Sequence, residues 1–128
     1  MTHQATIELL TAFCDALNRH DIDDCLSMMT DDCEFLAIAG PELEGKTFAG
    51  QDAVRAGLSA AWQNAPDAQW IDAEIFVDGE RGFVISTYTG TTADGARSEA
   101  RMIDAFTLRD GKIAIKNAFR KNRPPVNV

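Results

Sequence analysis

The sequence predicts one α+β domain in which helices come first and a mostly antiparallel sheet follows. Apolar residues recur at helical spacing through much of the first half of the chain, a pattern typical of helices that bury one face. Asp-Gly pairs at 78–79, 94–95 and 110–111 each separate two strand-like runs, which is a strong local signal for β-hairpins. The chain has 128 residues, of which 45% are hydrophobic, so residues 1–128 are long enough for a single domain with its own core.

Three segments are predicted to be helices, at 6–21, 22–29 and 51–64. The first has an apolar stripe at helical spacing that includes Leu10 and Leu17. Asp21 can cap the second helix, where a negative charge favours the positive end of the helix dipole. The third helix presents Leu58 and Trp62 on one side and ends before a proline. Each segment therefore has one face to bury.

The remaining segments are predicted to be strands and loops. Residues 33–39 are an apolar run too short for a helix, and a glycine-rich loop at 40–50 follows. Four further strands are expected at 69–77, 82–92, 97–108 and 112–121. Joined by the Asp-Gly turns, they form an antiparallel meander, and the helices cover one face of a curved sheet. Residues 123–128, with their two prolines, are expected to be a loose tail.

The charge of the chain argues against two classes of partner. Twenty acids against twelve lysines and arginines give a net charge of −8 at pH 7. That sign repels nucleic-acid phosphates and anionic lipids, so we expect no nucleic-acid partner and no membrane partner. The N-terminal residues lack a signal-peptide pattern, and no apolar run is long enough to span a bilayer. We therefore expect a cytoplasmic protein.

Neither the cysteines nor the acids indicate a bound metal. The three cysteines are odd in number and lack metal-ligand spacing, so we expect reduced thiols. Acids cluster at positions 21, 23, 24, 31 and 32, but helix capping and turn chemistry explain them. We expect neither a metal nor another cofactor.

Asp104 is the most unusual residue of the strand at 97–108. Side chains alternate between the two faces of a strand, so Asp104 shares its face with Met102, Phe106 and Leu108. A carboxylate among apolar side chains is costly unless it is paired, neutral or functional. An ion pair with an arginine across the sheet and a bond to a helix-terminal amide are the structural explanations. The functional explanation is a pocket acid that its apolar neighbours keep neutral.

Three stretches of the sequence resemble a known superfamily. They are LNRHDIDDCLSMMTDDCEF, GKTFAGQDAVRAGL and RMIDAFTLRDGKI. Their order and spacing resemble the nuclear transport factor 2-like superfamily, in its polyketide-cyclase-like (SnoaL-like) and ketosteroid-isomerase-like branch, over roughly residues 5–122. The resemblance implies a cone-shaped domain whose helices and sheet enclose a pocket. It does not imply one reaction, because such folds support many functions.

The resemblance also implies a role for Asp104. In the ketosteroid isomerases, an acid at the matching position donates a hydrogen bond to a developing oxyanion. The general base and the oxyanion tyrosine of that family fall at Ala37 and Phe13 here, so isomerisation by that mechanism is not expected. Epoxide-hydrolase chemistry needs an arginine where Met102 stands, and dehydratase chemistry needs pocket histidines that this chain lacks. An aldol-type cyclase needs only one strand acid, Asp104, to pass a proton to a carbonyl, and it is the leading catalytic hypothesis.

A further set of residues is expected to contact the ligand in such a pocket. These residues are Phe13, Leu17, Met29, Phe35, Ala37, Leu58, Trp62, Tyr88, Met102, Phe106, Asn117 and Phe119. Several of them, such as Trp62 and Tyr88, also suit a purely structural role. Asn117 and Phe119 share one face of the last strand, and a β-bulge would reverse which face points inward.

Two functions of different classes stay open. The first is a small, cofactor-independent cyclase, isomerase or lyase that uses Asp104 on an apolar, carbonyl-bearing substrate. The second is a non-catalytic domain that binds a small hydrophobic ligand, with Asp104 only orienting it. Both faces of the predicted sheet are partly apolar and the helices cover only one, so a homodimer through the convex face is expected.

Overall fold

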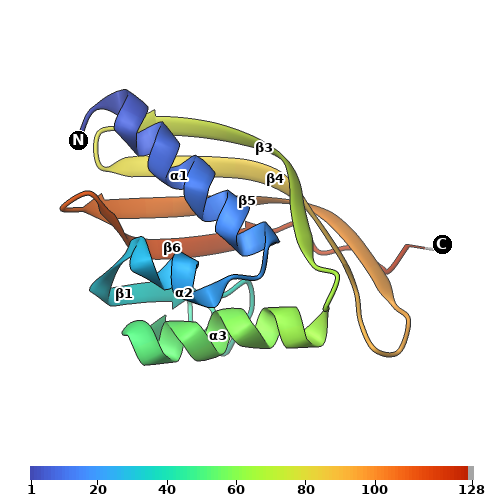
Figure 1. Cartoon of the computed structure of the whole chain (residues 1–128). Coiled ribbons are helices and arrows are strands. Elements are labelled where there is room, and N and C mark those ends of the chain that lie inside the picture. Colours follow the sequence, from blue (N-terminus) through green and yellow to red (C-terminus); the bar gives the residue numbers. More distant parts are fainter. Residues whose placement is uncertain (127–128) are drawn as a thin grey trace.

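The computed structural model describes residues 1–126 and has helices on one face of a six-stranded sheet (Figure 1). The helices are α1 (His3–Asn18), α2 (Ile22–Ser27) and α3 (Gln51–Asn64). The strands are β1 (Met29–Leu36), β2 (Thr47–Ala49), β3 (Gln69–Asp78), β4 (Arg81–Thr91), β5 (Arg97–Arg109) and β6 (Lys112–Arg120). The predicted α+β fold, with three helices packed on a mostly antiparallel sheet, is confirmed.

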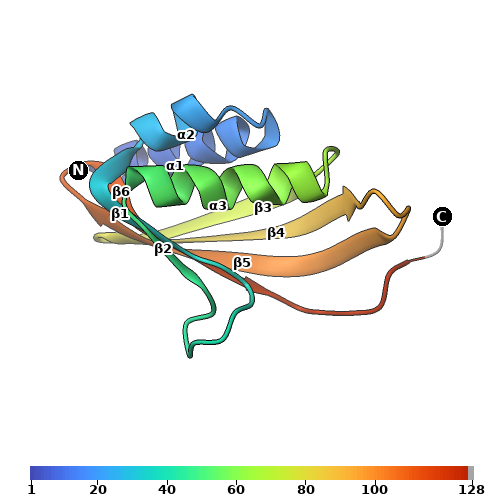
Figure 2. The ribbon, with the colours of Figure 1, turned by 90° about the horizontal axis from the view of Figure 1, so that it is seen from below.

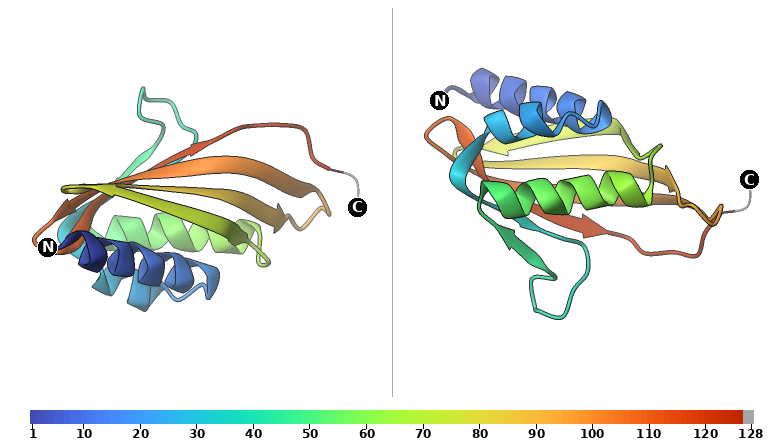
Figure 3. Two further views of the ribbon diagram at one scale, coloured as in Figure 1. Left: turned by 90° about the horizontal axis from the view of Figure 1, so that it is seen from above. Right: turned by 60° about the horizontal axis from the view of Figure 1, so that its bottom comes forward.

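The sheet has the strand order β2-β1-β6-β5-β4-β3 and does not close on itself. β3 to β6 form the predicted antiparallel meander. β1 pairs antiparallel with β2 and parallel with β6, so only the β1–β6 pair among the described strands is parallel. All three helices lie on one face, and the segment between β1 and β2 projects away on the other side (Figures 2 and 3). We call the face without helices the outer face.

The helices begin where local capping chemistry favours it. The Thr2 hydroxyl accepts the Ala5 N–H at 3.0 Å and starts α1. The Asp21 carboxylate accepts a hydrogen bond from the Asp24 N–H at 3.1 Å, so Asp21 caps α2 as predicted. Fully buried side chains of α1, such as Leu10 and Phe13, then pack on the sheet beside Phe106 of β5. The core therefore lies between the helices and the sheet.

The boundaries around β1 differ from the prediction. The helix expected at 22–29 ends at Ser27, and the strand expected at 33–39 begins at Met29 and ends at Leu36. Met29 lies opposite Ile113 of β6, so a distant strand supplies the pairing that extends β1 backwards. The short strand β2 lies within the predicted loop 40–50, because Phe48 pairs with Phe35 of β1.

A β-bulge between Thr107 and Leu108 decides which face of β6 points inward. Beyond the bulge, Phe106 lies opposite Lys116 and Asp104 lies opposite Ala118. Lys116 and Ala118 are buried on the helix side, whereas the Phe119 side chain is 53% exposed on the outer face. The bulge therefore reverses the expected facing of Asn117 and Phe119.

The chain beyond β6 crosses back to the start of β5. Val126 forms an isolated bridge with Arg97, in which the Val126 N–H donates to the Arg97 carbonyl at 2.8 Å. The end of the predicted tail, 127–128, lies outside the described residues. No helix of residues 1–126 has the length and apolar character to cross a bilayer.

Candidate functional site

A cavity of about 340 Å³ lies between α3 and the helix-covered face of the sheet. We call it the α3 cavity. Its lining residues are Phe35, Ala37, Ile38, Phe48, Gly57, Ala60, Ala61, Asn64, Trp70, Tyr88, Met102, Lys116, Ala118 and Arg120. Each of the six strands contributes at least one residue to this lining, so the lining forms only when the sheet is folded. Its size lies within the range of ordinary small-molecule sites.

Two aromatic pairs form much of the lining. The Phe35 and Phe48 rings stack with centroids 5.7 Å apart, and the Trp70 and Tyr88 rings lie tilted at 5.5 Å. Phe48 lies tightly against α3 because Gly57 has no side chain: a Cβ there would be 2.8 Å from the Phe48 ring. Flat rings from two pairs of adjacent strands favour a flat, mostly apolar ligand.

Asp104 is paired with Lys116 on the neighbouring strand. The Lys116 Nζ donates to Asp104 Oδ1 at 2.8 Å, and the two side chains are 3% and 6% exposed, respectively. The partner is a lysine rather than the arginine considered from the sequence. This ion pair compensates the free-energy cost of placing a carboxylate on an apolar face, because each buried charge lies beside an opposite one.

Lys116, and not Asp104, is the member of this pair that lines the α3 cavity. Its Nζ lies 5.0 Å from the centroid of the Phe35 ring, in cation–π contact. The sequence predicts the Asp104 carboxyl itself as the polar group facing a ligand, and in the structure Lys116 is the member of the pair beside the aromatic lining. The sequence contained a signal for Lys116, since Asp104 and Lys116 flank one hairpin turn, but their common face depends on the bulge.

Arg120 supplies a second cationic group to the lining. Its Cζ lies 4.7 Å from the Tyr88 ring centroid. Arg120 is half-buried, whereas Lys116 is buried, so the two cations differ in their access to solvent. Neither Arg120 nor Trp70 was expected from the sequence as a site residue. Their positions follow from the register of β6 and of β3.

The other expected contact residues divide into three groups. Phe35, Ala37, Tyr88 and Met102 line the α3 cavity. Phe13, Leu17, Met29, Leu58, Trp62 and Phe106 are buried in the core and are not part of that lining. Asn117 and Phe119 point to the outer face and are not part of it either. Outside β6, sequence periodicity identified the buried faces, but it did not separate core from cavity.

The thiols of Cys14, which is half-buried, and Cys25, which is buried, have no features of a nucleophile. Burial raises the pKa of the Cys14 thiol to about 11, and burial raises that of Cys25 to about 12. Both groups are therefore neutral near pH 7. Among residues 1–126, no group of three or more His, Cys, Asp or Glu side chains is arranged to hold a metal ion.

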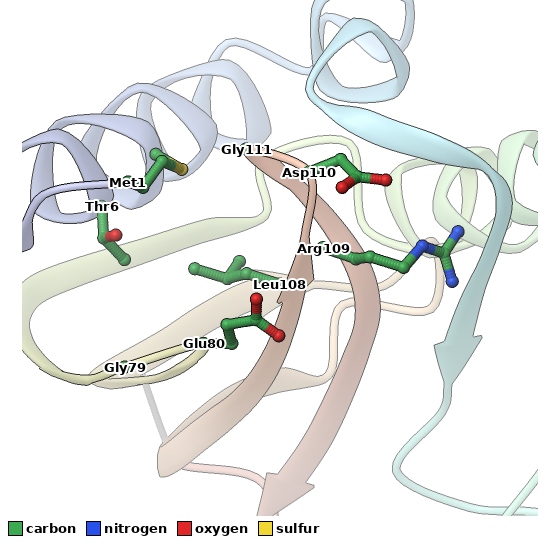
Figure 4. A pocket seen from close by; sticks show the side chains of 8 residues that line it. All are labelled: Met1, Thr6, Gly79, Glu80, Leu108, Arg109, Asp110 and Gly111. Atoms are coloured by element: carbon green, nitrogen blue, oxygen red, sulfur yellow. The ribbon is translucent and has the colours of Figure 1, made fainter.

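A second cavity, of about 410 Å³, opens at the start of α1 (Figure 4). It lies between the β3–β4 turn and the β5–β6 turn, and its charged side chains are Glu80, Arg109 and Asp110. Arg109 is already tied to Asp32 through an ion pair. Its buried polar side chain, Thr6, already donates its hydroxyl to the Thr2 carbonyl at 3.1 Å, so the α3 cavity is the better candidate site.

The chain belongs to the SnoaL-like domain family, whose family model matches residues 10–115. Among solved structures, a candidate polyketide cyclase from Xanthomonas campestris pv. campestris superposes with a TM-score of 0.82 and 21% identity, over 92% of this chain and 91% of that one. An NTF2-like protein from Burkholderia xenovorans LB400 superposes with a TM-score of 0.80 and 23% identity, over 94% of this chain and 92% of that one. TerC, crystallised with polyporic acid, superposes with a TM-score of 0.78 and 23% identity, over 91% of this chain and 92% of that one.

These structural similarities establish the fold. At such identities they do not carry an activity, because this fold supports many reactions. No curated protein matches the chain significantly in sequence.

Proposed function

We propose that the protein binds a small, mostly apolar, carbonyl-bearing molecule in the α3 cavity and acts on it as a cofactor-independent enzyme of the cyclase type. The observation that carries the proposal is the buried Asp104–Lys116 pair, with Lys116 in the lining of an otherwise largely aromatic and apolar cavity. A fixed polar group in an apolar, convergent cavity is typical of a small-molecule site.

In this proposal Lys116 is the group that touches the substrate. Its ammonium has three N–H donors, and one of them is directed at Asp104. Another can donate to a substrate carbonyl oxygen and stabilise the negative charge that develops there when an enolate forms. Asp104 acts through Lys116, because its carboxylate accepts a hydrogen bond from the ammonium and holds it in one place.

The lining favours aldol-type cyclisation over isomerisation that needs a strong base. No Asp, Glu or His belongs to the lining of the α3 cavity within residues 1–126. Ala37 lies in the lining at the position where the resemblance places a base, and it has no proton-accepting group. A substrate with an acidic 1,3-dicarbonyl group loses its proton to water without such a base, and Lys116 then stabilises the enolate. The enolate carbon forms a bond to the carbon of a second carbonyl, whose π bond breaks, and the oxygen of that carbonyl takes a proton back from water.

The second candidate function is non-catalytic binding of a small hydrophobic ligand. It is favoured by the same absence, among the described residues 1–126, of a carboxylate or imidazole from the lining. In that case the Asp104–Lys116 pair only orients a ligand oxygen. The three free cysteines, two of them buried, suit a reducing compartment, and we place either function in the cytoplasm.

Exchange of hydrogen for deuterium in a model ketone separates the two functions. The protein would be mixed with 2-tetralone in D2O, and exchange at the α-carbon followed by proton NMR. An enzyme of the proposed kind is expected to speed exchange saturably, by about tenfold or more over buffer. The double variant Asp104→Asn/Lys116→Met should lose this effect, while Arg101→Gln, on the outer face, should keep it.

Binding without faster exchange would favour the non-catalytic candidate. Binding is measured separately, as a saturable change in tryptophan fluorescence, because Trp70 lines the cavity. Equal exchange by the wild type and the double variant would show that Lys116 has no part in the chemistry. A thermal melt of each variant checks that it is folded.

A further inference from the structure

The lining of the α3 cavity has a charge opposite to that of the whole protein. The chain has a net charge of −8, yet the charged side chains in this lining are Lys116 and Arg120. No acid shares the lining with them within residues 1–126. A positively charged recess in an acidic protein attracts anions locally and repels cations, although the protein as a whole does the opposite.

Counting the charges at the site leaves one positive charge without a partner. Asp104, behind the lining, neutralises Lys116 through the contact of 2.8 Å. Arg120 makes no ion pair among the described residues, and its guanidinium lies over the Tyr88 ring instead. Partly buried cations are stabilised by an opposite charge, so one added negative charge would make the site neutral.

The donors at the site also suit an anion. Lys116 uses one of its three N–H groups on Asp104, and its bond to Asp104 is the only side-chain hydrogen bond found for it within residues 1–126. Arg120 has five N–H donors in a plane, a geometry that fits carboxylate or enolate oxygens. Hydrogen bonds from charged donors to oxygen anions are stronger than those between neutral groups.

The aromatic pairs restrict the shape of that anion. The stacked Phe35–Phe48 pair and the tilted Trp70–Tyr88 pair present flat surfaces to a cavity of about 340 Å³. Such surfaces favour a planar ligand over a branched aliphatic one. We infer that the ligand of the α3 cavity is a planar monoanion, an aromatic carboxylate or a stabilised enolate, whose charged oxygen binds Lys116 while Arg120 balances its charge.

This inference rests on the proposed function of the α3 cavity, and it adds the charge and shape of the ligand. It also agrees with the chemistry proposed above, because an ionised 1,3-dicarbonyl compound is itself a planar monoanion. The prediction is that the site prefers an anion over a neutral molecule of the same shape.

Two matched probes test the preference. Binding of 2-naphthoate and of 2-naphthamide, which differ mainly in charge, would be measured by isothermal titration calorimetry at pH 7. We expect naphthoate to bind about tenfold more tightly or better at low salt, with a smaller ratio in about 0.5 M NaCl. Arg120→Gln should reduce that ratio several-fold, whereas Arg101→Gln, on the outer face, should leave it unchanged.

The outcomes distinguish this inference from the function on which it rests. Equal binding of the two probes, or tighter binding of the amide, would overturn the anion preference and leave a small-molecule site intact. Equal loss of the preference in Arg120→Gln and Arg101→Gln would place the anion elsewhere and also overturn the inference. Absence of binding by both probes at millimolar concentration would contradict the proposed function as well.

Discussion

Removing one member of the buried Asp104–Lys116 pair is expected to destabilise the protein strongly. Lys116→Met deletes the ammonium and leaves the Asp104 carboxylate buried, with a side chain only 6% exposed and no cation beside it. Breaking a buried ion pair from one side typically costs about 3–5 kcal/mol. Small domains have unfolding free energies of about 5–15 kcal/mol, so this variant should be only marginally stable.

The matching variants make the cost interpretable. Asp104→Asn should cost less, about 1–3 kcal/mol, because the amide oxygen can still accept a hydrogen bond from Lys116. Asp104→Asn/Lys116→Met removes both charges and should be more stable than Lys116→Met alone. The cycle should therefore give a coupling energy of about 2 kcal/mol or more.

Urea denaturation of the four proteins at pH 7, followed by circular dichroism, measures these differences. Arg101→Gln is a control, because Arg101 is half-exposed and its ion pair with Glu74 spans 3.6 Å at the surface. A loss of less than about 1 kcal/mol in Lys116→Met, or additive effects of the two substitutions, would refute a buried and mutually dependent pair.

Three further predictions concern assembly, acid stability and thiol reactivity. We propose a homodimer through the outer face, where the Phe76 and Phe119 side chains are 54% and 53% exposed, respectively. The substitution Phe119→Glu should convert this dimer into a monomer, which light scattering would detect. A hydrogen bond from Arg109 holds the pKa of Asp32 below its ordinary value of 3.8. The stability that the ionised Asp32 carboxylate contributes is therefore present above pH 3.8 and is lost as the pH falls through the lower pKa of the folded state. Asp32→Asn should therefore lower the melting temperature at pH 7 but not at the acid end of a pH series. Because the Cys14 pKa is raised from 9.0 to about 11, the folded thiol should react much more slowly with Ellman's reagent at pH 8 than the thiol of the urea-unfolded chain does. The contribution of this raised pKa to stability should decline between pH 9 and about pH 11, because the unfolded chain loses the thiol proton first.

Each of these predictions has a clear contrary result. A wild-type monomer at micromolar concentration would contradict the dimer. An Asp32→Asn variant with the same loss of melting temperature at every pH would show that its effect is not the titration of a carboxylate. Equal rates of thiol modification in folded and unfolded protein would show that Cys14 is not protected by burial.

The amino-acid sequence by itself determined the class of the fold and the unusual residue of the site. Helical spacing of apolar residues located all three helices, and the three Asp-Gly turns located the hairpins of the meander. These are local signals, because each depends on residues that are neighbours in the chain. The same local alternation placed Asp104 on an apolar face, where its charge required a partner.

Only the tertiary structure decided what that partner is and which side chains meet a ligand. The face of β6 that points inward depends on the single extra residue near Thr107, because a shift of one residue moves every later side chain to the other face of a sheet. That shift brings Lys116 inward and sends Phe119 outward. The extension of β1 and the presence of Trp70 in the cavity lining likewise depend on pairing between segments far apart in sequence, which no local pattern records. Periodicity within a strand is a property of the chain, whereas register between strands is a property of the packed sheet.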